Sequence, residues 1–200
     1  MSCLLLKNAD VYAPEHLGLV DLLIVNDKIV RIGEHIDHPV GLSCQVLDAH
    51  GRKVVPGYVD QHVHIIGGGG ESGPYSRTPE IFLSELTRVG ITTVVGVLGT
   101  DGTSRHNESL LAKARGLTHD GISAYMLTGS YEIPVHNMTG DVRRDIILIN
   151  ECLGVGEIAL SDHRSSQPTR AELEKILTQS RLGGMLAGKA GVVQFHMGVG

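Results

Sequence analysis

Residues 54–74 read VVPGYVDQHVHIIGGGGESGP and place a short apolar strand, two histidines and four consecutive glycines next to one another. The strand begins near Gly57, and His62 and His64 come near its end. Because side chains two residues apart in a strand lie on one face, the two imidazoles converge. Convergent imidazoles are suitable ligands for Zn²⁺. By itself the pattern is weak evidence, because two hydrogen-bonded histidines at a strand end would look the same.

Four further apolar segments repeat the order of strand, loop and helix. Their starts, together with Gly57, are 31 to 36 residues apart, about the length of one βα unit. One helix is expected after the cap at Thr78-Pro79, with Gly90 as its stop. The alternation predicts a parallel sheet covered by helices. Strands are predicted to begin near Gly57, Ile91, Ile122, Gly156 and Val192, and helices to cover 79–89, 110–117, 141–153 and 169–182.

A (β/α)₈ barrel and an open doubly wound sheet both have this alternation. The glycines Gly67–Gly70 are followed by Glu71, so neither a dinucleotide loop nor a P-loop is present. The barrel is therefore favoured. Five strands do not close an eight-stranded barrel, which takes about 250 residues. We predict an α/β fold, a partial TIM-like β/α barrel over residues 56–200, whose remaining strands would follow Gly200.

Residues 1–55 are predicted to form a separate, small antiparallel β-sandwich domain. Asn26-Asp27 is a turn signal between two of its strands. The last two strands are expected to pair with each other around His50-Gly51. The apolar runs that predict strands cover 4–6, 20–25, 29–32, 45–48 and 53–55.

Composition and charge exclude several classes of protein. The formal net charge is −5 and no basic run occurs, which argues against nucleic acid or an anionic membrane surface as a partner. No apolar stretch approaches the roughly 18 residues of a membrane span, and no secretory signal is visible at the start. Cys3, Cys44 and Cys152 are odd in number and widely spaced, so we expect reduced thiols and a cytoplasmic location.

Two more candidate metal ligands follow from the positions of the strands. Glu157 falls in the fourth strand of the predicted sheet and His196 in the fifth, near the rim that carries His62 and His64. A carboxylate can bridge two divalent ions through its two oxygens. Alone, Glu157 would suit a salt bridge and His196 a buried hydrogen-bonded histidine. On successive strand ends after a His-x-His pattern, the set favours a binuclear metal centre.

Five segments of the sequence carry a family resemblance. Pro-Gly-x-x-Asp-x-His-x-His is a mark of the amidohydrolase superfamily of metal-dependent hydrolases. Gly-Gly-Gly-Gly-Glu, Leu-Gly-Thr-Asp and Ser-Asp-His-Arg-Ser are similar to the isoaspartyl (β-aspartyl) dipeptidases within it. The resemblance runs from about residue 10 to 200, and the chain looks like the N-terminal half of a member of that family. Its segments are 54–74, 92–113 (TTVVGVLGTDGTSRHNESLLAK), 124–134 (AYMLTGSYEIP), 159–169 (ALSDHRSSQPT) and 192–198 (VVQFHMG).

The resemblance implies a centre of two zinc ions. His62 and His64 match ligands of the more buried zinc, and His196 matches a ligand of the other. Glu157 stands where the family usually has a carboxylated lysine as the bridge. Glutamate is shorter but supplies a permanent carboxylate without CO₂.

The resemblance also implies a substrate site for a small dipeptide. Glu71 would hold the free α-ammonium, Arg164 the carboxylate, and Tyr131 would polarise the scissile carbonyl. From the residues alone, Glu71 could be a solvated loop acid, Arg164 could pair only with Asp162, and Tyr131 could be a half-buried rim residue. The positions that match the family's substrate-binding residues are Gly69, Gly70, Glu71, Thr100, Tyr131 and Arg164.

The expected activity is zinc-dependent hydrolysis of the isopeptide bond of β-aspartyl dipeptides by a metal-bridging hydroxide. A later zinc-binding histidine, a second substrate arginine and the catalytic aspartate of the family lie beyond residue 200. We therefore expect the 200-residue chain to be an incomplete, hydrolytically inactive part of a longer enzyme, which would be a homo-oligomer.

Two other classes of function stay open from the sequence. A dihydroorotase, D-aminoacylase or deacetylase of the same superfamily would share His62, His64 and a bridging acid, but not the Gly-Gly-Glu and Ser-Asp-His-Arg segments together. A non-catalytic scaffold derived from an amidohydrolase would bind no metal. A serine hydrolase is not supported, because no Gly-x-Ser-x-Gly elbow occurs.

Overall fold

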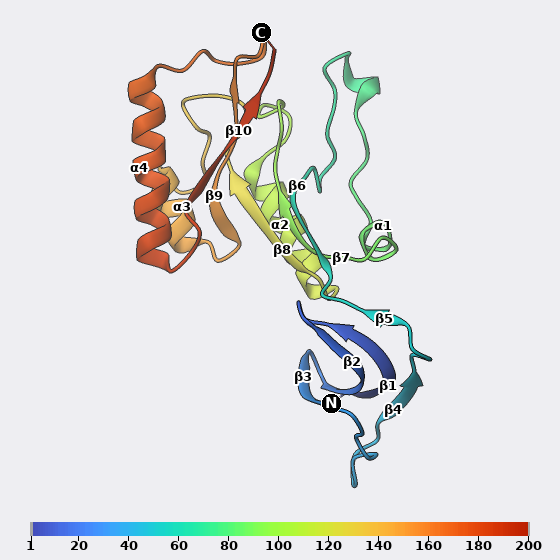
Figure 1. The fold of residues 1–200 in the computed structure, drawn as a ribbon. Coiled ribbons are helices and arrows are strands. Elements are labelled where there is room, and N and C mark those ends of the chain that lie inside the picture. The colour runs from blue at the N-terminus through green and yellow to red at the C-terminus, as the bar shows by residue number, and fades with distance from the viewer. Residues whose placement is uncertain (1, 200) are drawn as a thin grey trace. The chain divides into compact units, whose positions relative to one another are not determined.

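The first sheet is built around strand β1 (Cys3–Tyr12). It pairs antiparallel with β2 (His16–Val25), which pairs antiparallel with β3 (Lys28–Gly33). Asn26 lies in the connecting turn with a positive φ of 54°, a conformation that asparagine tolerates. The computed structural model describes residues 2–199 (Figure 1). The first sheet belongs to a unit that ends at Gly57, and a second unit begins at Tyr58.

The strands β4 (Gln45–Asp48) and β5 (Lys53–Val54) both pair in parallel with β1, so the sheet is mixed. The expectation that they pair with each other around His50-Gly51 is wrong. These two residues do form a turn with positive φ angles of 51° and 73°. However, Gly51 N–H donates to the carbonyl of Asn8 at 2.9 Å, so the turn stays against β1 and the chain continues along the same edge.

A disulfide joins Cys3 and Cys44, although reduced thiols were expected. The cause is the register of the sheet: Leu4 pairs with Gln45 in parallel, so the residues that precede them lie side by side. A separation of 41 residues conceals this neighbourhood in the sequence. Cys152 is buried and free. The small core of this unit consists of Ala9, Val11, Val20, Leu22 and Ala49.

The second unit contains a sheet of five parallel strands that follow one another in chain order, as the sequence predicts. Figure 1 shows helices packed along one side of this curved sheet. The fold is the α/β half-barrel expected from the repeat of strand and helix. The strands are β6 (Tyr58–Val63), β7 (Ile91–Gly96), β8 (Ser123–Thr128), β9 (Cys152–Leu160) and β10 (Val192–Met197).

Two of the helices in the described part of the chain begin after a residue whose side chain caps the first turn. The carboxylate of Asp141 accepts from Arg144 N–H, and Thr169 forms a capping box with Glu172. Gly188 ends the last helix in the left-handed conformation. The helices are α1 (Leu83–Thr87), α2 (Asn107–His119), α3 (Val142–Leu148) and α4 (Arg170–Ala187), and a short 3₁₀ turn, η1, covers Pro74–Ser76.

Two helices are shorter than predicted. The α1 helix does not begin after Thr78-Pro79, because this stretch bonds to the glycine segment: Thr78 N–H donates to the carbonyl of Gly68 at 3.0 Å. The α3 helix ends at Leu148, because Cys152 and Leu153 already belong to β9. The α4 helix extends five residues past the predicted end at Leu182.

The two faces of the parallel sheet differ in their surroundings. The helix-covered face buries the main core, a cluster that includes Val94, Met126 and Ile158 of the strands together with residues of the helices such as Leu110 and Ile146. The other face lines a hollow of about 460 Å³. This inner face corresponds to the interior of a barrel, which side chains normally fill. The hollow is lined by Val59, Gln61, Thr93, Val95, Tyr125, Leu127, Leu153, Ala190, Val192, Val193 and Gln194.

No helix within residues 2–199 is long and apolar enough to cross a membrane.

Candidate metal centre

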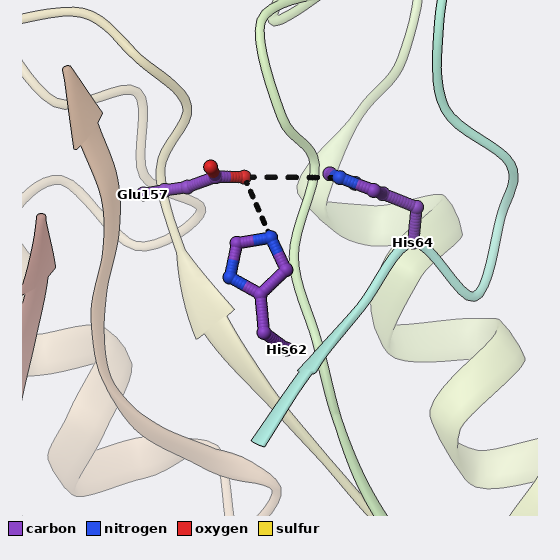
Figure 2. Close-up of side chains that lie close together, drawn as sticks. All are labelled: His62, His64 and Glu157. Carbon is purple, nitrogen blue, oxygen red and sulfur yellow. Dashed lines mark ion pairs between the residues drawn. The ribbon is translucent and has the colours of Figure 1, made fainter. Parts of the chain in front are cut away.

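Three potential metal ligands converge at the carboxyl ends of the parallel strands. His62 lies in β6, His64 follows the end of that strand, and Glu157 lies in β9. Figure 2 shows both rings directed at one oxygen of the glutamate: Oε2 is 3.3 Å from Nε2 of His62 and 3.9 Å from Nε2 of His64. One ligand atom from each residue lies within 4.8 Å of the other two. The strand register thus brings together groups that are far apart in the sequence.

The environment of Glu157 fits a bound cation. Glu157 is 1% exposed, and its Oε2 atom has no hydrogen-bond partner among the residues that the structure describes. A buried carboxylate oxygen without a partner costs free energy, and a metal ion would compensate this cost. Two imidazole nitrogens and a carboxylate oxygen are a donor set typical of zinc and similar divalent ions.

The second oxygen of Glu157 faces another histidine. His196, in β10, has its Nδ1 3.0 Å from Oε1 of Glu157 and 3.0 Å from the hydroxyl of Tyr131. His196 therefore lies outside the three-residue cluster, on the opposite oxygen of the same carboxylate. A carboxylate with one oxygen toward a histidine pair and the other toward a third histidine has the arrangement of a bridging ligand.

The ring of His64 is held from both sides by glycine backbone. A Cβ atom added to Gly68 would lie 3.1 Å from Cγ of His64, and one added to Gly99 would lie 2.8 Å from its Cε1. The Nδ1 atom lies 3.3 Å from the carbonyl oxygen of Val97. If Nδ1 donates its proton to this carbonyl, Nε2 is free to bind a metal. Histidines that bind metals through one ring nitrogen commonly donate from the other in this way.

Beside the candidate ligand His196 lies a hollow of about 360 Å³ that gathers most of the predicted substrate residues, since Nη2 of Arg164 in its lining is 3.2 Å from Nε2 of His196. Arg164 Nη1 donates to Oε1 of Glu71 at 3.0 Å, so an acid and a base from different loops meet here. Asp101 and His163, to which the sequence motifs assign no role, also line this hollow. The lining residues are Gly69, Gly70, Glu71, Thr100, Asp101, His163 and Arg164.

Asp162 anchors the guanidinium of Arg164. The Nε and Nη2 atoms of Arg164 donate to the two carboxylate oxygens at 2.9 and 2.8 Å. These hydrogen bonds hold the pKa of Asp162 well below its usual range and raise the pKa of Arg164. The spacing of two residues in Ser-Asp-His-Arg is the sequence signal for this pair. Arg164 thus bonds to Asp162 and to Glu71 together, not to Asp162 alone.

Tyr131 follows β8 and is buried, with 5% of the residue exposed. The guanidinium carbon of Arg164 lies 5.1 Å from the centre of its ring. Burial, together with the negative charge of Glu157, raises the pKa of Tyr131 to about 12. The phenol is therefore protonated near neutral pH and can donate a hydrogen bond.

Comparisons with known proteins support the resemblance seen in the sequence. Two crystal structures of β-aspartyl dipeptidase from Fervidobacterium islandicum AW-1 match 99% of the chain with 48% identity and a TM-score of 0.94. One of them is in complex with β-Asp-Leu dipeptide. The chain covers 54% and 52% of those chains, so it spans about half their length. The resemblance to this dipeptidase extends over nearly all residues of the present chain.

More distant proteins share the fold or part of the sequence. A D-hydantoinase from Thermus sp. matches 96% of the chain and 40% of its own length with 20% identity and a TM-score of 0.65, which shows the fold alone. A dihydroorotase from Staphylococcus aureus is 38% identical over 90 residues, 45% of this chain and 20% of the relative. An adenine deaminase from Paracoccus denitrificans is 31% identical over 110 residues, 51% of this chain and 17% of the relative. No protein-family model matches the chain.

Proposed function

We propose that this chain supplies the metal centre and the substrate pocket of an enzyme that hydrolyses the isopeptide bond of β-aspartyl dipeptides. The observation that carries the proposal is the position of Glu157. One of its oxygens faces His62 and His64, and the other faces His196. In this proposal His62, His64 and His196 would hold two zinc ions, and Glu157 would be the carboxylate shared between them.

The bound ions would supply an activated water molecule and polarise the scissile carbonyl. The residues of the chain orient the substrate around them. The protonated phenol of Tyr131 donates a hydrogen bond to the carbonyl oxygen, on which negative charge develops during the attack. The group that transfers the proton to the leaving amine is expected, from the family resemblance, outside residues 1–200.

The charges of the pocket support a β-aspartyl substrate. Such a dipeptide carries a free α-ammonium and a free α-carboxylate on the same carbon atom. Glu71 is a natural partner for the ammonium, and Arg164 can bind a carboxylate through two parallel hydrogen bonds. Thr100 lines the same hollow and offers a hydroxyl to the carboxylate. An ordinary α-linked dipeptide does not present both charges together and would leave one pocket charge unpaired.

The assembly and location of the enzyme are part of the proposal. A homo-oligomer in the cytoplasm is expected from the resemblance and the sequence. The Cys3–Cys44 disulfide bears on the cytoplasmic location, because disulfides persist mainly in oxidising compartments. Thiol titration of protein isolated under conditions that trap free cysteines tests it: about two protected cysteines per chain would argue against the cytoplasm.

The experiment that tests the activity uses the complete protein that contains these residues. Purified protein is assayed with β-Asp-Leu, α-Asp-Leu and dihydroorotate, before and after treatment with a chelator. The proposal predicts metal-dependent release of leucine from β-Asp-Leu and much slower hydrolysis of the other two compounds. Release from α-Asp-Leu at the same rate, or turnover of dihydroorotate alone, would contradict it.

A further inference from the structure

The guanidinium of Arg105 is buried beneath the glycine segment that precedes Glu71. Arg105 lies between β7 and α2, and the residue is 4% exposed. Its Nη2 donates to the carbonyl of Gly68 at 2.7 Å and its Nη1 to the carbonyl of Gly69 at 3.1 Å. One planar group thus holds two successive peptide units, a geometry that a lysine ammonium cannot reproduce.

Among the residues that the structure describes, this cation forms an ion pair with Asp101 but no hydrogen bond to it. Oδ2 of Asp101 is 3.8 Å from Nη1 of Arg105, which is beyond hydrogen-bond distance. Its buried Nε has no partner among the residues that the structure describes. A buried charge held mainly by carbonyl oxygens is an expensive way to stabilise a fold. Such a local conflict is typical of a functional site.

The segment that Arg105 holds has little rigidity of its own. Gly67, Gly69 and Gly70 have φ angles of +82°, +67° and +106°, which glycine adopts freely. Gly68 lies against the ring of His64, which blocks movement in that direction. Arg105 fixes the segment from another direction, and the next residue after the glycines is Glu71. The position of the Glu71 carboxylate therefore depends in part on these two hydrogen bonds, beside the bonds between Gly68 and Thr78 and the bond from Arg164 to Glu71.

We propose that Arg105 is a positioning residue that sets the specificity of the pocket by holding Glu71 where it meets the substrate's α-ammonium. This inference rests on the proposed function. Arg105 does not itself line the hollow, and its recorded contacts are the carbonyls of Gly68 and Gly69 and the carboxylate of Asp101. It acts through the carbonyls of Gly68 and Gly69. Its removal would mainly weaken substrate binding and would leave the metal content unchanged.

The test compares Arg105→Met with Arg105→Lys in the complete protein. Arg115→Met is the matched control, since Arg115 is an exposed residue of α2 that pairs with Glu151. For β-Asp-Leu we expect Arg105→Met to raise KM roughly 10-fold or more with a smaller change in kcat and the wild-type metal content. Arg105→Lys should lie between Arg105→Met and the wild type, and it also provides the readout if the methionine variant does not fold.

The decisive step is to repeat the substitution in a Glu71→Gln background. If Arg105 acts through Glu71, Arg105→Met raises KM in the wild type but has little further effect in Glu71→Gln. An unchanged KM, or the same factor in both backgrounds, would overturn the inference. A wild-type protein that does not hydrolyse β-Asp-Leu would instead refute the proposed function, and the inference with it, so the two failures are distinguishable.

Discussion

Arg164 donates a hydrogen bond from Nη1 to Oε1 of Glu71 at 3.0 Å, across 93 residues of sequence. The base and the acid proposed to hold the two charges of the substrate therefore neutralise each other in this structure. A zwitterionic ligand can replace this contact with two of its own, whereas a ligand with a single charge would leave one partner unpaired. The ion pair thus makes the pocket complementary to a molecule that carries both charges.

Substitution of Glu71 by glutamine tests this complementarity. The amide keeps the shape of the side chain but loses a charge-assisted hydrogen bond of about 1.5–3 kcal/mol, so kcat/KM for β-Asp-Leu should fall roughly 10- to 150-fold. Steady-state kinetics and metal analysis measure the effect. Glu174→Gln is the control, because Glu174 pairs with Arg170 on the exposed surface of α4. Equal kinetics for the two variants would count against a role for Glu71 in binding.

Removal of the Tyr131 hydroxyl tests its proposed contact with the scissile carbonyl. Tyr131→Phe preserves the buried ring but deletes a donor aimed at developing charge, so kcat should fall about 10²- to 10³-fold with a small change in KM. Single-turnover kinetics with β-Asp-Leu would separate this step from binding. A large rise in KM with unchanged kcat would assign the hydroxyl to substrate binding instead.

The small β unit should lose stability in acid through Asp21. Burial alone would raise the pKa of its carboxyl, but hydrogen bonds from Lys7, Asn8 and Ile36 outweigh this effect and lower it to about 2. Because the folded-state pKa lies below the ordinary value of 3.8, the contribution is present above about pH 4. It disappears as the pH falls through 2.

Asp21→Asn measures this contribution. Above pH 5 the variant should be less stable than the wild type by about 1–2 kcal/mol, because it loses the charged carboxylate that the lowered pKa reflects. The figure is kept small because solvent partly screens the pair with Lys7. Denaturant unfolding curves of both proteins at several pH values provide the data. The difference should shrink between about pH 4 and pH 2. A difference that does not change with pH would show that the carboxylate charge is unimportant.

Gly67 should resist substitution for steric reasons. At its φ of +82°, a Cβ atom would lie 2.2 Å from the carbonyl oxygen of Thr78. Gly67→Ala should therefore destabilise the protein by more than about 2 kcal/mol, with backbone strain and a clash acting together. Gly116→Ala is the matched control, because a Cβ at this position in the last turn of α2 would meet nothing within 4 Å. That change should stabilise by about 0.5–1 kcal/mol. Thermal unfolding compares the two variants, and equal melting temperatures would contradict the steric argument.

The parallel half of the fold could be predicted because its signals are local. Apolar strands and helices alternate at a regular spacing, and each of the five predicted strands is present. The capping residues Asp141 and Thr169 mark helix starts within a residue. The positions of His62, Glu157 and His196 at one rim follow from the same repeat, because parallel strands end at a common edge.

The features that the sequence did not predict depend on register between distant segments. The parallel pairing of β4 and β5 with β1, and hence the Cys3–Cys44 bond, arises from contacts about 40 residues apart. The late start of α1 reflects bonds from Thr78 to the glycine segment. Arg105 was missed for a similar reason, because its partners are backbone carbonyls 36 and 37 residues away.

The proposed function depends above all on Glu157, which would bridge two metal ions held by His62, His64 and His196. Anomalous diffraction from crystals of the complete, zinc-loaded protein, collected on both sides of the zinc absorption edge, tests it most directly. We predict two zinc peaks on opposite oxygens of the Glu157 carboxylate, one also bound by the His62–His64 pair and the other by His196. Zinc bound elsewhere, with this carboxylate coordinating neither ion, would contradict the account.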